Sequence, residues 1–294
     1  MTIAVDRRAG IPSESLLGDL VLAGAFALLA IPTAMTLSVE TWSSESGAQG
    51  PLVLATGGWL LWRLRDEFKQ EGKPGNFAIC IALLVASLAA YVFGRAFDFL
   101  TMEAGGAYLA GMTMIYARFG GRLMIKHWFP FLYLAFAVPP PAYLLDRATQ
   151  PLKQFVSHIS TDALAATGLP VSREGVTIFV GQYQLLVEDA CSGMNSIIGI
   201  IAVTLLYAHL AHRSSLRYSL LLLALAVPIA VAANILRIIT LILLTYYAGD
   251  SVAQGFLHYT AGFFLFALAI LLVFALDKTL RIALSFGGFH DHTT

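Results

Sequence analysis

Residues 218–247 carry one charged side chain, Arg237, in an otherwise uncharged stretch of thirty positions. A helix needs roughly 20 mostly apolar residues to cross the hydrocarbon core of a bilayer, so this segment is long enough to span a membrane. The rest of the chain is similar, because 58% of its 294 residues are hydrophobic and only 12% are charged, against about 25% in ordinary soluble domains. A soluble fold cannot bury so much apolar surface, and the sequence therefore predicts an integral membrane protein.

Eight segments approach the length of a membrane span. They are Leu16 to Met35, Pro51 to Trp62, Phe77 to Phe93, Phe99 to Tyr116, Trp128 to Leu145, Ser192 to Leu210, Tyr218 to Tyr247 and Tyr259 to Leu276. The first is longer than the core of a signal peptide and lacks a small-residue cleavage site, so we expect it to be retained. The pattern predicts an all-α polytopic membrane protein with about eight transmembrane helices, in a single domain over residues 1–294.

Lysine and arginine gather in alternate connections between these segments. With the N-terminus inside, the cytoplasmic segments hold 13 of the 18 basic residues, namely Arg7, Arg8, Arg63, Arg65, Lys69, Lys73, Arg118, Arg122, Lys126, Arg213, Arg217, Lys278 and Arg281. Such a bias in short loops sets orientation, so both termini are predicted to be cytoplasmic, in the cytoplasmic (inner) membrane. The formal net charge is zero, which gives no sign of a nucleic-acid partner.

This topology leaves one long outer segment, residues 146–190, between the fifth and sixth spans. Its first half, Pro151 to Ala166, has apolar residues near helical spacing and predicts an amphipathic helix lying on the membrane. Two β-prone runs, Val176 to Val180 and Tyr183 to Val187, flank Gly181-Gln182, where glycine can supply the positive φ of a type II′ turn. A small β-hairpin is therefore expected just before the sixth span.

Cys191 stands where this hairpin gives way to the sixth span, beside a helix N-terminus. The dipole of a helix N-terminus favours anions and can lower the pKa of a thiol toward the nucleophilic thiolate. Asn195, one helical turn further on, can help to orient a substrate. Glu188 or Asp189 can orient a histidine, or Asp189 can cap the helix. A small packing residue is the alternative for Cys191, and it is the interpretation given to the mid-span Cys80.

Arg237 and His258 complete a trio of residues suited to acyl transfer. An arginine at a helix centre costs from about 2.5 to well over 10 kcal/mol, so Arg237 should face the bundle interior or a wet cavity, with Asn234 on the same face. His258 opens the last span near the same outer level, and consecutive elements are usually neighbours. A thiolate can attack a peptide carbonyl while a histidine transfers protons and an arginine stabilises the developing charge.

Other interpretations of these residues stay open. Arg237 and Asn234 can line the pathway of a membrane transporter or channel, although no inverted repeat supports this, and another membrane enzyme can use Cys191 or His258. Arg237 can also snorkel or belong to an internal ion pair. The remaining histidines show no clear pair of helical ligands, so no metal site and no cofactor are predicted. Three charged residues near the outer level, Arg95, Asp98 and Glu103, are interpreted as a local charge pair rather than part of a substrate groove.

The motifs around the trio resemble those of the exosortases and archaeosortases. The similarity rests on Ala190-Cys191-Ser192-Gly193, on Asn234-x-x-Arg237 and on His258, and it extends from about Phe129 to Phe274. Further similar segments are Phe129-Pro130-Phe131, Pro139 to Pro141 and Gly168-Leu169-Pro170-Val171.

The resemblance implies a membrane cysteine transpeptidase or protease with a catalytic core at residues 188–276. Its catalytic residues would be Cys191, Arg237 and His258, with Asn195, Asn234, Glu188 and Asp189 in supporting or substrate-binding roles. Its partners would be membrane lipids and exported proteins whose C-terminal sorting tails, of the PEP-CTERM class, carry a short motif, a hydrophobic helix and a basic cluster. Cleavage would take place at the outer face of the membrane and would require no cofactor.

Overall fold

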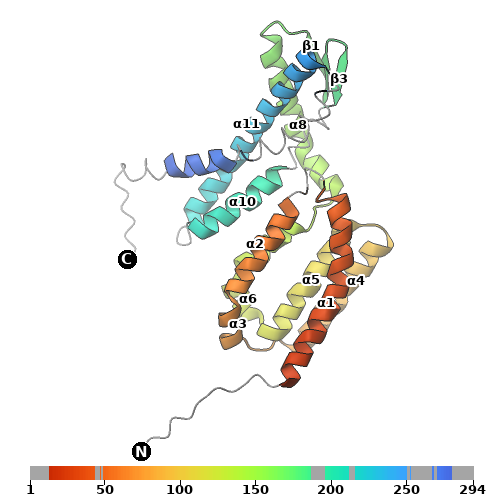
Figure 1. The fold of residues 1–294 in the computed structure, drawn as a ribbon, viewed down its shortest axis with the longest axis vertical. Coiled ribbons are helices and arrows are strands. Elements are labelled where there is room, and N and C mark those ends of the chain that lie inside the picture. The colour runs from red at the N-terminus through yellow and green to blue at the C-terminus, as the bar shows by residue number, and fades with distance from the viewer. Residues whose placement is uncertain are drawn as a thin grey trace, which may run out of the picture. The chain divides into compact units, whose positions relative to one another are not determined.

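The computed structural model describes residues 13–43, 47, 49–186, 196–211, 216–249, 252, 267 and 270–279. The chain divides into two compact units, and Figure 1 shows their helices. Unit one comprises Met1–Val39 and Leu61–Phe131, and unit two comprises Glu40–Leu60 and Leu132–Thr294. Each unit buries apolar clusters of its own. Whether the chain acts as one exosortase-like domain stays a prediction.

The described part of unit one consists of helices and short connections between them. Its helices are α1 (Ser13–Glu40), α3 (Arg65–Glu71), α4 (Phe77–Ala96), α5 (Leu100–Phe119) and α6 (Gly121–Lys126). The helices α2 (Gln49–Arg63) and α7 (Trp128–Leu134) begin in one unit and end in the other. A buried aromatic and aliphatic cluster of Phe68, Leu123 and Phe131 ties α3, α6 and α7 together within this unit.

Glycines allow α4 and α5 to approach closely. A Cβ atom added at Gly94 would collide with the backbone of Glu103, and one added at Gly106 would collide with the backbone of Tyr91. Small residues at such positions let membrane helices pack backbone to backbone. The sharp connection between the two helices contains Asp98, whose φ is 55°.

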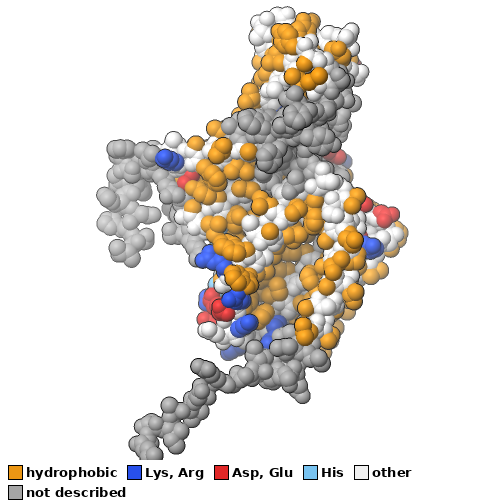
Figure 2. Space-filling view, viewed as in Figure 1, with side chains coloured by type: hydrophobic (Ala, Val, Ile, Leu, Met, Phe, Trp, Pro, Cys, Tyr) orange, Lys and Arg blue, Asp and Glu red, His pale blue; other side chains and the backbone are white. Residues whose placement is uncertain are grey.

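Three helices are long and apolar enough to cross a membrane. They are Leu20–Glu40 in α1, Phe77–Ala96 in α4, and Tyr218–Ala248 in α11 (Leu216–Ala248). They coincide with the first, third and seventh predicted spans. Large apolar side chains such as Leu28 and Phe77 stand exposed on α1 and α4, where Figure 2 shows extensive hydrophobic surface. Exposed apolar surface of this extent is what a lipid-facing helix requires, and the protein is therefore a membrane protein.

The other predicted spans fit less well, and a total of eight stays a prediction. The second corresponds to α2, which has 15 residues, and the sixth to α10 (Ser196–Ala211), which has 16. The fourth corresponds to α5, which is long enough but carries Glu103. Of the eighth, residue 267 and residues 270–276 are described, all of them helical. The apolar helical stretches Trp128–Ala137, in the fifth predicted span, and Ile198–Ala211, within α10, are shorter than a span.

The fifth predicted span, Trp128 to Leu145, is wrong as one continuous helix. The helix α7 ends at Leu134, a short 3-10 turn η1 covers Ala135–Ala137, and α8 begins only at Ala142. Pro139, Pro140 and Pro141 lie between them. Three consecutive prolines lack the backbone N–H groups that a helix interior needs and push their predecessors into extended backbone.

Unit two is built around α11. Toward its C-terminal end α11 packs against α8 (Ala142–Ala165) and a small sheet, in a core of Val156, Leu164, Ile178, Val180, Ile238, Leu241 and Ile242. Toward its N-terminal end it packs against α10 and the helical residues 270–279, in a core of Ile200, Ala208, Leu222, Ala226, Ala230, Ala233 and Val273. One long helix thus connects two apolar cores.

The sheet contains the predicted hairpin and one additional strand. Strands β1 (Val171–Glu174), β2 (Thr177–Val180) and β3 (Tyr183–Leu186) form an antiparallel meander in the order β1-β2-β3. Val180 pairs with Tyr183, so Gly181-Gln182 is the two-residue loop that the sequence predicts. Gly181 has φ 57° and, among described residues, Asp98 alone has positive φ without being glycine. A single left-handed glycine at the first central position is the pattern of a type II′ turn.

Candidate functional site

Arg237 and Asn234 are almost completely buried on α11. Arg237 is 2% exposed and Asn234 is 4% exposed. The two residues are three positions apart and therefore lie on one face of the helix. Burial of an arginine on an otherwise uncharged helix agrees with the expectation that it faces the interior rather than lipid, because an arginine facing hydrocarbon is strongly unfavourable.

Arg237 lies where α11 changes its packing partners. The buried alanines before it, Ala230 and Ala233, belong to the core shared with α10 and residues 270–279. The buried residues directly after it, Ile238 and Leu241, belong to the core shared with α8 and the sheet. The guanidinium group is therefore carried at the junction of two apolar cores, where four elements of unit two contact the same helix.

The helix α8 turns a polar face toward the interior of unit two. Its buried side chains are mostly polar, and they are Thr149, Lys153, Val156, Ser157, Ser160, Thr161 and Leu164. Lys153 is only 6% exposed, whereas Phe155 is 50% exposed. The helix is amphipathic as predicted, but it begins at Ala142 instead of near Pro151. Its exposed side carries charged residues such as Arg147 and Asp162, while its buried side mixes hydroxyl groups with the apolar Val156 and Leu164.

Two hydroxyl groups on this inner face have no hydrogen-bond partner in the part of the chain that the structure describes. Thr149 donates to Leu145 O and Thr161 to Ser157 O, both at 2.8 Å, but the Oγ atoms of Ser157 and Ser160 are buried without a partner. An unsatisfied buried hydroxyl costs about 1–3 kcal/mol. Sequence interpretation missed this face, although polar residues at every fourth position from Thr149 to Thr161 were the signal that could have shown it.

Cys191 and His258, and with them Glu188, Asp189 and Asn195, lie outside the described residues. The neighbouring elements are described: β3 ends at Leu186 and α10 begins at Ser196. Both β3 and α10 contact α11.

Residues 41–275 match the family model of the transmembrane exosortases (Exosortase_EpsH). The chain belongs to the transmembrane exosortase family. No curated protein and no solved structure matches it. The family match begins well before Phe129, where the motif resemblance begins, so α2 to α6 are part of the exosortase region as well. All seven candidate site residues lie inside the matched range.

Arg237 and Asn234 are thus the two candidate site residues of this exosortase that the structure describes. Both lie in the seventh predicted span, and their roles stay a prediction. In the described ranges, no three His, Cys, Asp or Glu side chains gather where they could hold a metal ion. The expectation that the exosortase needs no metal or cofactor stays a prediction.

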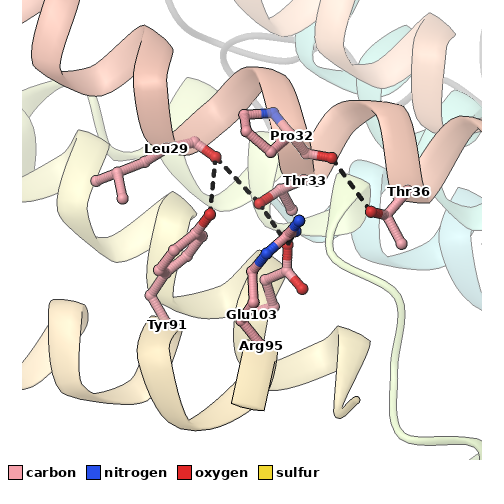
Figure 3. A network of polar contacts seen from close by, with 7 residues as sticks. All are labelled: Leu29, Pro32, Thr33, Thr36, Tyr91, Arg95 and Glu103. Carbon is pink, nitrogen blue, oxygen red and sulfur yellow. Dashed lines mark hydrogen bonds and ion pairs between the residues drawn. The ribbon is translucent and has the colours of Figure 1, made fainter. Parts of the chain in front are cut away.

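Glu103 belongs to a different polar network, in unit one (Figure 3). Its Oε1 accepts a hydrogen bond from Arg95 Nη1 at 2.7 Å and lies 2.8 Å from the hydroxyl of Thr33. The hydroxyl of Tyr91 donates to Leu29 O at 3.4 Å beside them. The network joins α1, α4 and α5 of the exosortase, and the interpretation of Arg95 and Glu103 as a charge pair is confirmed.

The charged side chains of α3 and α6 form a surface cluster in unit one, visible as mixed blue and red in Figure 2. Lys126 pairs with Glu67 and, at 3.3 Å, with Glu71, and His127 Nε2 lies 3.0 Å from Glu67 Oε1. The hydrogen bond from Lys126, reinforced by His127, lowers the pKa of Glu67, and the same pairing raises the pKa of Lys126. The cluster holds α3 against α6.

Proposed function

We propose that this exosortase is a cysteine transpeptidase or protease that cleaves C-terminal sorting tails of exported proteins. The proposal assigns Cys191 as the nucleophile, His258 as the acid and base, and Arg237 as the electrostatic stabiliser. Membership of the transmembrane exosortase family supports the activity. The observation that carries the assignment is the burial of Arg237 at 2% exposure on an apolar helix, because a charge is retained in such a place when it has a function.

The chemistry proceeds in two balanced steps. The Cys191 thiolate attacks the scissile carbonyl, the peptide C–N bond breaks, and His258 donates a proton to the leaving amine. An acyl group is then attached to Cys191 as a thioester. A second nucleophile, either an acceptor amine or hydroxyl or a water molecule, loses its proton to His258 and attacks the thioester, and the C–S bond breaks to restore the thiolate.

Arg237 would stabilise negative charge and would not transfer protons. A guanidinium stays protonated under all ordinary conditions and presents five donors in a planar fork. In a site shielded from water it stabilises either the thiolate or the oxyanion of the tetrahedral intermediates, and removing such a donor typically costs about 3–4 kcal/mol. Asn234, one turn away on the same face, can hold the guanidinium or the substrate in place.

The site is proposed to face the outer side of the cytoplasmic membrane, with both termini in the cytoplasm. The excess of basic residues in the segments placed inside supports this orientation. The substrate's hydrophobic helix would lie in the lipid beside the protein, and its motif would reach the outer level. The recognised tail would carry its basic cluster on the cytoplasmic side.

The test is cleavage of a tagged protein that carries a C-terminal sorting tail, with Cys191→Ala and Cys80→Ala compared side by side. These are the two cysteines of the chain, so the pair separates a catalytic thiol from a general effect of losing one. Mass spectrometry should show loss of the tail with the native chain and with Cys80→Ala. Continued cleavage by Cys191→Ala would overturn the assignment of the nucleophile.

A transporter or channel lined by Arg237 and Asn234 is the second candidate. It predicts that flux through reconstituted vesicles changes with Arg237 and is indifferent to Cys191. The family match favours the enzyme. Flux without tail cleavage would reverse this preference.

A further inference from the structure

The small sheet of unit two ends in an edge that no described strand covers. The strand order is β1-β2-β3, so β3 pairs with β2 on one side only within the described chain. Gln184, in the interior of β3, has an exposed side chain. An open edge displays backbone N–H and C=O groups that can pair with another extended segment.

Along β2, the backbone N–H and C=O groups of successive residues point alternately toward β1 and toward β3. The N–H of Gly181, which directly follows β2, donates to Pro170 O at 3.1 Å, and Pro170 directly precedes β1. The peptide groups of Gly181 therefore point to the β1 side. Because the direction reverses at each residue of a strand, those of Val180 and Ile178 point to the β3 side.

The same alternation identifies the outward peptide groups of β3. Val180 pairs with Tyr183, and Ile178 pairs with Leu185. Tyr183 and Leu185 therefore exchange hydrogen bonds with β2. Gln184 and Leu186 lie between and beyond them, so their N–H and C=O groups point away from β2. The edge offers two donors and two acceptors at a spacing of two residues.

This edge belongs to a strand that packs on α11, the helix that carries Arg237. Leu185, between Gln184 and Leu186, packs against the buried core that contains Ile238, the residue directly after Arg237. A peptide paired with β3 would therefore lie beside the part of α11 that carries Arg237.

We propose that the outer edge of β3 binds the substrate by strand addition, with the peptide next to the scissile bond extended along Gln184 and Leu186. The proposal rests on the proposed function, since its occupant is the sorting segment of an exported protein. Strand addition draws affinity from main-chain hydrogen bonds. The edge therefore recognises peptide backbone at alternate residues, while pockets elsewhere select side chains.

The first test replaces Gln184 by proline. The N–H of Gln184 takes no part in pairing with β2, and proline is tolerated at edge positions whose N–H faces outward. The change deletes one outward donor and places a ring where an added strand would lie. We expect kcat/KM for a sorting-tail substrate to fall about tenfold, mainly through KM, as the loss of one good hydrogen bond would give.

The chain offers a matched control on the opposite edge of the same sheet. Arg173 on β1 pairs with Ile178, whose peptide groups point to β3, so the peptide groups of Arg173 also point outward. Arg173→Pro should leave KM within about twofold of the native value. An equal loss in Arg173→Pro and Gln184→Pro, or no loss in Gln184→Pro, would overturn the proposal.

A second measurement keeps the proposal testable if Gln184→Pro fails to fold. This measurement uses the native chain and a series of synthetic peptide substrates, each with one N-methylated peptide bond. Methylation at every second position of the paired segment should raise KM, and methylation at the positions between should not. Uniform sensitivity along the peptide would contradict strand addition. If instead Gln184→Pro dissociates a dimer in detergent without changing KM, the edge binds a second copy of the chain and the proposal fails.

These outcomes are separate from a failure of the proposed function. Cleavage that does not depend on Cys191 sinks the catalytic assignment, whatever the edge variants do. Cleavage that depends on Cys191 and ignores both the edge variants and the N-methyl pattern sinks the strand-addition proposal alone.

Discussion

The two units each bury a charged side chain, and the two charges have different surroundings. Glu103 in unit one is 5% exposed and is bound by Arg95 and Thr33, which come from the two helices packed beside its own. Arg237 in unit two is 2% exposed and lies between two clusters of alanine, valine, leucine and isoleucine. The helix α8, which packs against α11, carries the buried hydroxyls of Ser157 and Ser160, for which the described part of the chain supplies no partner.

The comparison distinguishes buried polar groups that stabilise packing from buried polar groups that are kept for activity. A buried polar group whose partners are all in place stabilises the packing of the helices that supply them. Unsatisfied hydroxyls lower stability, and a protein keeps such groups mainly where it needs them for function. We infer that the Glu103 network stabilises the packing of α1, α4 and α5, whereas the inner face of α8 gives up stability at Ser157 and Ser160.

The largest effect is expected from Arg237→Lys. Lysine keeps the positive charge but loses the planar fork of donors, so kcat/KM for tail cleavage should fall about 100-fold or more. Thermal unfolding in detergent should show that the variant remains folded. A variant that cleaves normally, or one that only unfolds, would make Arg237 a structural charge like Glu103.

Glu103→Leu should produce the opposite pattern. The substitution leaves Arg95 and Thr33 without their shared acceptor, and we expect the free energy of unfolding to fall by about 2 kcal/mol. Activity per folded molecule should not change. Thr36→Val is the control, because the Thr36 hydroxyl donates to Pro32 O of its own helix, at 3.2 Å. Lost activity in a stable Glu103→Leu protein would place Glu103 in the functional site.

Ser157→Ala and Ser160→Ala test whether the buried hydroxyls of α8 lower the free energy of unfolding. Removing a hydroxyl that has no partner should leave the free energy of unfolding unchanged or raise it by up to about 1 kcal/mol. Thr161→Val, which removes a hydroxyl that is already bonded, should be neutral or slightly destabilising. Destabilisation by both serine variants would mean that these hydroxyls have partners in the native protein.

The smallest effect concerns the surface cluster of α3 and α6. Pairing with Lys126 and His127 lowers the pKa of Glu67 below its ordinary value of 4.5. The carboxylate's contribution is therefore fully present above pH 4.5 and is lost as the pH falls through the lowered pKa. The protection factors of the α3 amides, which correct the exchange rates for their intrinsic pH dependence, should fall over that acidic range, and Lys126→Met should bring the onset closer to pH 4.5. Protection that does not change with pH would show that apolar packing of Phe68 alone holds α3.

Local patterns predicted much of this molecule. The apolar runs predicted α1, α4 and α11, and the Gly181-Gln182 pair predicted the β2-β3 turn, because helix and turn formation depend on nearby residues. Strand β1 was missed, since only pairing with β2 makes Val171–Glu174 extended. The predicted fifth span overlooked Pro139 to Pro141, whose local signal against a helix was already in the sequence.

The sequence by itself determined that the chain enters a membrane, that it belongs among the exosortases, and that Arg237 cannot face lipid. These conclusions follow from composition, motifs and the cost of an isolated charge, none of which requires coordinates. Tertiary packing shows that the buried side of α8 carries hydroxyl groups, that Arg237 lies at the junction of two cores, and that the peptide groups of Gln184 and Leu186 point away from β2. Periodicity shows that a helix has two faces or that a strand alternates, but only the packed neighbours decide which side is covered.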